Sequence, residues 1–442
     1  MSVLANDTSM TSLADSSAPS RFENPALLRR RRRAEIRFQL YGLAAIAISL
    51  AFLAILFTSI IGNGWTAFFQ TSIELPVTFD KDVIAPDGDL TPAALSQANF
   101  QKLAYTALYK FLDVDSASRS QRNAANALLS RETDSQLRDM VAADHSLIGQ
   151  TKNVWVLASG NADAFLKGKI NPAVPEQNRL LSDQQLAWID KLTGNGLMKK
   201  FFNTGLFTNT ASSQPETAGL AVALLGSFYI MLIVVLLSVP LGVAAAIYLE
   251  EFAPKNRITD LIEVNINNLA AVPSIVFGLL GLAVFINFAG LPRSASLVGG
   301  LVLTLRTLPT VIIATRASIT AVPPSIREAA LGVGASKVQT VFHHVLPLSL
   351  PGIITGTILG LIQALGETAP LLMIGMVAFV VDIPRSPLDP ATALPVQIYM
   401  WATEAERGFV EKTAGATIVL LAILAVMNIA AMILRKRYER KW

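Results

Sequence analysis

Residues 328–337 read Glu-Ala-Ala-Leu-Gly-Val-Gly-Ala-Ser-Lys, and the pair Leu346-Pro347 follows them. Long apolar stretches flank this segment, so it connects two candidate membrane spans. Its glycines and capping residues predict two short helices and a sharp turn on one side of the membrane, with the second helix ending at the proline. Such a projecting surface is suited to receive force from a partner protein. On this local evidence, an ordinary loop between two spans is an equal alternative.

Two capping patterns define the expected helices. Ser325 and Glu328 have the S-x-x-E spacing, which predicts the start of the first helix. Gly334 comes about two turns later, and glycine readily adopts the positive φ that ends a helix. Ser336 and Gln339 repeat the capping-box spacing and predict the start of the second helix.

The segment also resembles a known signature, the EAA motif of ABC-importer permeases, with Gly334 and Leu346-Pro347 in register. One departure is His344, where many members carry Ile or Val. In that family the EAA helices sit in a groove of the ATP-binding subunit. The resemblance therefore implies a coupling surface formed by Glu328, Ala329, Ala330, Gly334, Leu346 and Pro347.

The composition independently indicates a membrane protein. Of the 442 residues, 52% are hydrophobic and 15% are charged, and the mean hydropathy is +0.48, which is too apolar for an ordinary soluble chain of this size. The sequence contains no Cys, and its three His residues are His145, His343 and His344. Disulfides and thiolate sites are therefore excluded, and a histidine metal site is not expected.

Six apolar stretches are long enough to cross about 30 Å of hydrocarbon. Arginines at 29–33 precede the first stretch, and Arg435, Lys436 and Arg437 follow the last. The positive-inside rule therefore predicts that both termini, and with them residues 328–337, are cytoplasmic. The predicted spans are residues 41–61, 219–249, 266–289, 297–320, 352–380 and 414–434.

The remaining segments complete the expected domain organisation. The first span lacks a clear signal-peptidase site, so we expect it to be retained as an anchor. The expected parts are a disordered basic cytoplasmic tail at 1–37, a first transmembrane helix at 38–61, a periplasmic domain at 62–215, a five-helix permease domain at 216–434 with its EAA loop at 321–350, and a basic cytoplasmic tail at 435–442.

Residues 62–215 have balanced charges and enough length for a hydrophobic core of their own. Helical spacing and extended runs predict an α+β domain, with Trp155 and Trp188 as core aromatics. Its role is open between a structural module and a ligand sensor or docking surface for a binding protein. The expected helices are 100–112, 124–141 and 181–192, and the expected strands are 72–79 and 153–157.

Two ionisable residues interrupt the apolar spans at matched depth. Arg306 lies before the cytoplasmic end of the fourth span and Glu367 after the start of the fifth; with a rise of 1.5 Å per residue, both are roughly 21 to 23 Å from the inner face. They are expected to form an ion pair, which could release the guanidinium group to an anion or could be purely structural. Arg316 lies near the inner end, where it can snorkel to the interface or meet an anion that leaves the pathway.

The sequence Gly366-Glu367-Thr368-Ala369-Pro370-Leu371-Leu372 resembles the G-E-T-A-P-L-L signature of the phosphate-importer permeases. Together with the EAA segment and the run at 394–398, it is similar to the second of the two permease subunits over roughly 216–434. Many members carry Arg where this chain has Gln363 or Ile313, and Arg306 and Arg316 could compensate. The resemblance implies an anion pathway with Arg306, Arg316, Gln363, Glu367 and Thr368.

The resemblance implies an all-α polytopic membrane protein with six transmembrane helices of the ABC type I importer permease kind and an inserted α+β extracytoplasmic domain. It implies a transport subunit of the bacterial inner membrane and not an enzyme. The chain lacks a Walker A sequence, so ATP and Mg²⁺ would bind to a partner ATPase, and no catalytic residue, metal ligand or cofactor is assigned to this chain. The expected partners are a sister permease or a second copy of the chain, two ATP-binding subunits, a periplasmic phosphate-binding protein, inorganic phosphate and membrane lipid, but no nucleic acid.

Two other functions fit part of the pattern. A permease for another oxyanion, such as sulfate or molybdate, would share every general feature of this sequence and lack only the motif around Glu367. A membrane receptor with a periplasmic sensor domain would share the first span and the outer domain. Such a receptor would also need a cytoplasmic signalling module, and this sequence continues with apolar spans instead.

Overall fold

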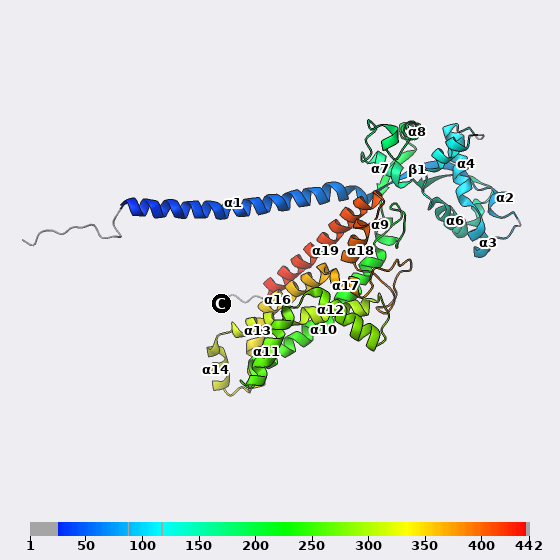
Figure 1. Cartoon of the computed structure of the whole chain (residues 1–442). Helices are drawn as coiled ribbons and strands as arrows, with labels where there is room; N and C mark the ends of the chain where they lie inside the picture. Colours follow the sequence, from blue (N-terminus) through cyan, green and yellow to red (C-terminus); the bar gives the residue numbers. More distant parts are fainter. Residues whose placement is uncertain (1–24, 87, 116–117, 439–442) are drawn as a thin grey trace, which may run out of the picture. The chain divides into compact units, whose positions relative to one another are not determined.

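The computed structural model describes residues 25–86, 88–115 and 118–438, and the chain divides into two units, residues 1–59 and 60–442. Helix α1 (Pro25–Gly64) is one long helix (Figure 1), and residues 28–59 within it are exposed. The predicted disorder is therefore wrong for residues 25–37, because arginine favours helix and the apolar run that follows propagates it. Residues 1–24 of that predicted tail lie outside the described residues.

The domain expected at residues 62–215, which we call the outer domain after that expectation, contains a three-stranded antiparallel sheet in the order β2-β1-β3, formed by β1 (Phe69–Thr78), β2 (Thr151–Leu157) and β3 (Met198–Phe202). On the central strand, Ile73 lies opposite Val156 on one side and Met198 on the other. Alternate side chains of β1 are buried, as expected for a strand with one face toward a core. The α-helices of this domain are α2 (Lys81–Ile84), α3 (Pro92–Gln97), α4 (Phe100–Leu112), α5 (Arg119–Asn126), α6 (Thr133–Ala143), α7 (Gly160–Leu166), α8 (Asp183–Gly194) and α9 (Gly205–Thr208).

Most of the predicted α+β elements of this domain are confirmed, but the helix expected at 124–141 is two helices, α5 and α6. The residues between them pair with the end of β2: Leu129 forms a bridge with Ala158, and Ser130 donates its N–H to the carbonyl of Leu157 at 3.0 Å. Trp188 is buried as predicted. Trp155 is only half-buried, because it lies on the opposite face of β2 from its buried neighbours and contacts Phe201 edge-on.

The remaining helices form the membrane part. They are α10 (Ala221–Ile247), α11 (Arg257–Ala270), α12 (Ser274–Gly281), α13 (Ser296–Thr320), α14 (Pro324–Gly332), α15 (Lys337–Thr340), α16 (Leu346–Gly366), α17 (Ala369–Met373), α18 (Leu394–Ala402) and α19 (Gly408–Tyr438). Three π-helical turns extend them, at Tyr248–Phe252 after α10, at Leu282–Phe288 after α12 and at Val341–Val345 before α16.

The described part of the chain contains five helical stretches long and apolar enough to cross a membrane, or six if the bent pair of α11 and α12 is one broken span. That pair corresponds to the predicted third span and bends by 100° just before α12. Pro273 lies at the break, and a proline disfavours helical geometry in the residue that precedes it. The last span continues as α19 to Tyr438, so residues 435–438 of the predicted basic tail are helical, and 439–442 lie outside the described residues.

The fifth predicted span, 352–380, is shifted in the structure. The helical stretch runs from Lys337 to Gly366, and the chain then breaks before the short helix α17. Pro347 lies in the first turn of α16 and does not end a helix, so that prediction is wrong. A proline is tolerated there because the π-helical turn Val341–Val345 has already shifted the hydrogen-bond pattern, and the first turn does not need the missing N–H.

Helix α13 packs between α10 and α16, and glycines allow the close approach (Figure 1). A Cβ atom at Gly356 would lie 2.1 Å from the Cβ of Ala314, and one at Gly242 would lie 2.7 Å from Cγ1 of Val311. Small residues at helix contacts are typical of membrane bundles, where backbone proximity replaces the hydrophobic driving force. This packing fixes the face of α13 that carries Arg306.

Candidate functional site

The turn between α14 and α15 has the geometry that the sequence predicts. Gly334 has φ +90°, and the Ser336 and Gln339 side chains form a complete capping box at the start of α15. The first predicted capping box is wrong, because α14 begins at Pro324 and Ser325 lies inside its first turn. Proline at the first helical position is pre-organised for a helix start, so it takes precedence over the serine.

The surface of this turn is open and partly apolar. Glu328 and Ala329 are exposed on α14, while Ala330 is buried against the body of the protein. Exposed apolar residues surround the turn, namely Leu331, Val333, Val338 and Phe342. A patch of this kind, with a charged residue at its edge, is typical of a protein–protein contact.

An ion pair that sequence reasoning missed holds α14 in place. Arg327 donates through Nε and Nη2 to Oε1 of Glu251, at 3.0 and 2.7 Å. It also donates to the carbonyls of Val322 and Ile319, at 2.7 and 2.9 Å. Four hydrogen bonds from one guanidinium group fix the angle between α14 and the ends of α10 and α13. In the sequence, this ion pair was indicated only by Glu251, an acidic residue at the end of an apolar span.

A second cluster binds Arg316. Its Nε and Nη2 each lie 3.3 Å from Oε2 of Glu250, and its Nη2 lies 2.8 Å from Oε1 of Glu263 on α11. Arg316 is ten residues beyond Arg306 on α13, about 15 Å along the helix axis. The structure therefore places Arg316 apart from Arg306, in a site where two carboxylates already neutralise it.

The predicted ion pair between Arg306 and Glu367 is confirmed. Nη2 of Arg306 lies 2.5 Å from Oε1 of Glu367, with the two side chains 24% and 18% exposed. Glu367 follows the last residue of α16 in extended conformation, so the carboxylate is presented at a break in the helix. We refer to Arg306 and Glu367 as the membrane pair.

The membrane pair is chemically unsaturated. A guanidinium group has five N–H donors. Within the described residues Arg306 contacts Glu367 alone, and neither side chain makes a further hydrogen bond. Gln363 is exposed and Thr368 is half-buried in the adjoining turns. The arrangement offers free donors next to a neutralised charge, which is what transient binding of an oxyanion requires.

Comparisons with known proteins agree with this architecture. Residues 238–442 match the family "Binding-protein-dependent transport system inner membrane component". The chain is 34% identical over 250 residues to a probable ABC transporter permease protein, YqgI, of Bacillus subtilis, covering 54% of this chain and 84% of the relative. The chain belongs to the ABC transporter permease family. The match to the family domain begins within α10 of this permease and includes α11 to α19, so α14 and the membrane pair both lie within it.

Other relatives carry more specific names. The permease is 32% identical over 217 residues to the phosphate transport system permease protein PstA 1 of Mycobacterium tuberculosis, covering 49% of this chain and 70% of the relative. A solved structure of a methionine ABC transporter, MetNI, covers 50% of this chain and 97% of its own, at 18% identity and a TM-score of 0.40. Residues 26–176 match a separate domain family of unknown function, DUF3333.

Proposed function

We propose that this permease is the transmembrane subunit of an ATP-driven importer of inorganic phosphate and forms half of its translocation pathway. The observation that carries the proposal is the membrane pair, a guanidinium–carboxylate contact between α13 and the residue after α16, to which no other ion pair is added within the described residues. Relatives named as phosphate transport permeases, at 32% identity, support the choice of phosphate over other oxyanions.

The proposed mechanism uses the donors that Arg306 leaves free. An entering phosphate would bind the remaining N–H groups of Arg306, with the Thr368 hydroxyl and the Gln363 amide nearby as further donors. The Glu367 carboxylate stays in contact with the guanidinium group, compensates its charge between transport events and repels the bound anion. Release then follows because the competing carboxylate weakens anion binding.

The coupling turn around Gly334 is the proposed contact with an ATP-binding subunit. Its exposed apolar residues and Glu328 would lie in a groove of that subunit, and Arg327 would pass the force to α10 and α13 through Glu251. In this proposal ATP and Mg²⁺ bind to two such subunits, a sister permease completes the pathway, and a periplasmic binding protein delivers phosphate. Both termini are cytoplasmic and the membrane is the bacterial inner membrane.

Uptake of labelled anions tests the substrate. The complex reconstituted in liposomes should import labelled phosphate when ATP is supplied on the side of the coupling turn, and should import sulfate far more slowly. Faster uptake of sulfate or molybdate would replace the phosphate assignment with the other oxyanion. Absence of any ATP-dependent anion uptake would remove the proposal.

Variants of the turn test the coupling assignment separately. Gly334→Val forces a β-branched residue into φ +90°, so we expect it to distort the turn and lower the phosphate imported per ATP hydrolysed by about tenfold. Glu328→Ala should act in the same direction. Ser325→Ala, in the same helix and without a capping bond to lose, is the matched control. An unchanged ratio of transport to hydrolysis in both variants would contradict the assignment.

A further inference from the structure

A cavity of about 630 Å³ lies where the outer domain meets the start of the last transmembrane helix. Its walls come from α7 and the residues after it, from the segment that leads into α10, and from the first turn of α19. A second cavity of about 350 Å³ shares Gly160, Asn161, Glu216 and Glu406 with the first. The volumes are in the range of small-molecule sites.

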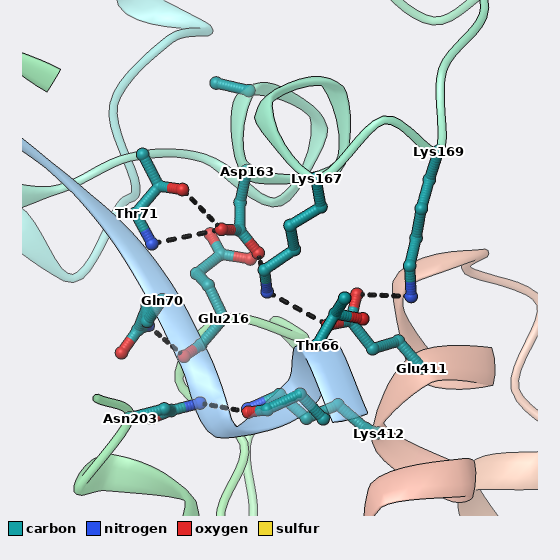
Figure 2. A network of polar contacts seen from close by, with 12 residues as sticks. Thr66, Gln70, Thr71, Asp163, Lys167, Lys169, Asn203, Glu216, Glu411 and Lys412 are labelled. Atoms are coloured by element: carbon teal, nitrogen blue, oxygen red, sulfur yellow. Dashed lines mark hydrogen bonds and ion pairs between the residues drawn. The ribbon is translucent and has the colours of Figure 1, made fainter. Parts of the chain in front are cut away.

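One wall of the cavity is an ion cluster that is internally satisfied. Lys167 lies 2.5 Å from Asp163 and 3.0 Å from Glu411, and Lys169 lies 2.8 Å from Glu411 (Figure 2). Asp163 also accepts from the N–H and hydroxyl of Thr71, at 3.0 and 2.6 Å. We call Asp163, Lys167, Lys169 and Glu411 the junction cluster. It joins the outer domain to α19 and leaves no charge of its own uncompensated.

Two other buried charged residues of the cavity, Glu216 and Lys412, form no ion pair within the described residues, although the carboxylates of Asp163, Glu411 and Glu216 lie near enough to attract the Lys412 ammonium group. Glu216 is 8% exposed, and its carboxylate has no ion pair or hydrogen bond within the described residues. Lys412 is 6% exposed, and its ammonium group makes a single hydrogen bond in the described structure, to the carbonyl of Ala218 at 3.1 Å. Burial of an ionised group is unfavourable unless other polar groups replace its water, so these two side chains favour a ligand that supplies such groups.

The two groups require opposite ligand chemistry. The Glu216 carboxylate needs hydrogen-bond donors, and the Lys412 ammonium group has two N–H donors left for an acceptor. Glu406 also lines the cavity: partial burial raises its pKa, and the nearby negative charges of Glu216 and Glu404 raise it further, so this side of the cavity disfavours additional negative charge. Apolar lining residues such as Ile170, Val174 and Val410 leave room for a short hydrocarbon linker.

We propose that this cavity binds a small zwitterion, with its ammonium group on Glu216 and its oxyanion on Lys412. The source is either a free solute or the head group of a zwitterionic lipid, because both can present an ammonium and a phosphate a few bonds apart. The site is distinct from the membrane pair, and it does not depend on which anion the permease transports. Since its walls come from both the outer domain and α19, its occupancy stabilises the junction between them.

Calorimetric titration of the full-length chain tests the site. In nanodiscs of phosphatidylglycerol, O-phosphoethanolamine should bind more tightly than either of its halves, ethanolamine or inorganic phosphate. Glu216→Gln should weaken binding of O-phosphoethanolamine by about 10- to 100-fold, as expected for loss of one charge-assisted contact, and should leave the phosphate titration unchanged. Asp190→Asn, which removes an exposed carboxylate of α8 that does not line the cavity, is the matched control.

A second variant covers the case in which Glu216→Gln fails to fold. A Cβ atom at Gly160 would lie 3.1 Å from Oε2 of Glu216, so Gly160→Ala crowds the carboxylate without removing it and should also weaken binding. Nanodiscs of phosphatidylethanolamine separate the two sources: a lipid head group in the site abolishes the O-phosphoethanolamine signal, whereas a site for free solute keeps it. Binding that is no tighter than that of the two halves, or that both variants leave unchanged, overturns the proposal.

Discussion

The membrane pair and the junction cluster both hold ionised side chains away from bulk water, yet they are built in opposite ways. In the junction cluster the Lys167 side chain is 4% exposed and contacts two carboxylates, one of which is bound by a further lysine. In the membrane pair Arg306 is 24% exposed and its one described contact is Glu367. A saturated network has little capacity to accept another ligand, whereas an unsaturated pair does.

The difference suggests a division of roles. Removal of one member of a saturated buried network leaves other charges buried and unpaired, so it should lower the free energy of unfolding. Removal of one member of an unsaturated, partly exposed pair leaves a group that water can reach, so it should mainly lower transport. Variants of the junction cluster are therefore expected to change the free energy of unfolding, and variants of the membrane pair to change phosphate uptake. The reverse result would contradict this division.

The largest effect is expected from removal of the central ammonium group of the junction cluster. Lys167→Met leaves the carboxylates of Asp163 and Glu411 buried and close together, which should lower the free energy of unfolding by about 3 kcal/mol. Thermal unfolding of the purified chain measures it, with the exposed Lys152→Met as the control. A loss below about 1 kcal/mol would mean that the cluster is not a structural joint.

For the membrane pair the expected loss is in transport. Arg306→Ala should lower phosphate uptake by about 10- to 100-fold, because the anion loses a charged donor, while the amount of folded protein in the membrane stays close to normal. Arg293→Ala, an exposed arginine just before α13, is the control. Normal uptake together with a fall in abundance would make the pair structural instead.

A double-mutant cycle sharpens the same point. If Arg306 and Glu367 act on each other, the effects of Arg306→Ala and Glu367→Ala on uptake should not add, with a coupling energy between about 0.5 and 3 kcal/mol. The same cycle with Arg316→Ala in place of Arg306→Ala should be additive, because Arg316 binds Glu250 and Glu263 instead. Equal coupling in both cycles would indicate a general effect of charge in the membrane.

The sequence was sufficient to predict the membrane pair because its members stand out. A charge inside an apolar run is rare, and the constant rise of a helix converts sequence position into depth. The turn at Gly334 was predictable for a similar reason, since a glycine just before the Ser336–Gln339 capping box indicates the end of one helix and the start of the next. In both cases local chemistry and periodicity carry the information.

The junction cluster could not be found in that way. Asp163 and Lys167 lie in a domain whose charges are numerous and balanced, and their partner Glu411 is more than 200 residues away, at the start of a span that hydropathy placed at residue 414. The continuous helix through Pro347 was missed because the effect of proline was judged without the π-helical turn that precedes it, and the break of the third span at Pro273 was not predicted at all. These outcomes depend on tertiary contacts.

The smallest expected effect tests whether saturation is what distinguishes the cluster. Lys169 is its outermost member, with a side chain that is 30% exposed, and it supplies only the second contact of Glu411. Lys169→Gln should therefore lower the free energy of unfolding by no more than about 1 kcal/mol, because water can replace the lost ammonium group while Lys167 continues to neutralise Glu411. Thermal unfolding in parallel with Lys167→Met measures the ratio of the two effects. A loss as large as that of Lys167→Met would mean that each contact of the cluster is needed on its own, and that saturation does not protect it against the loss of one partner.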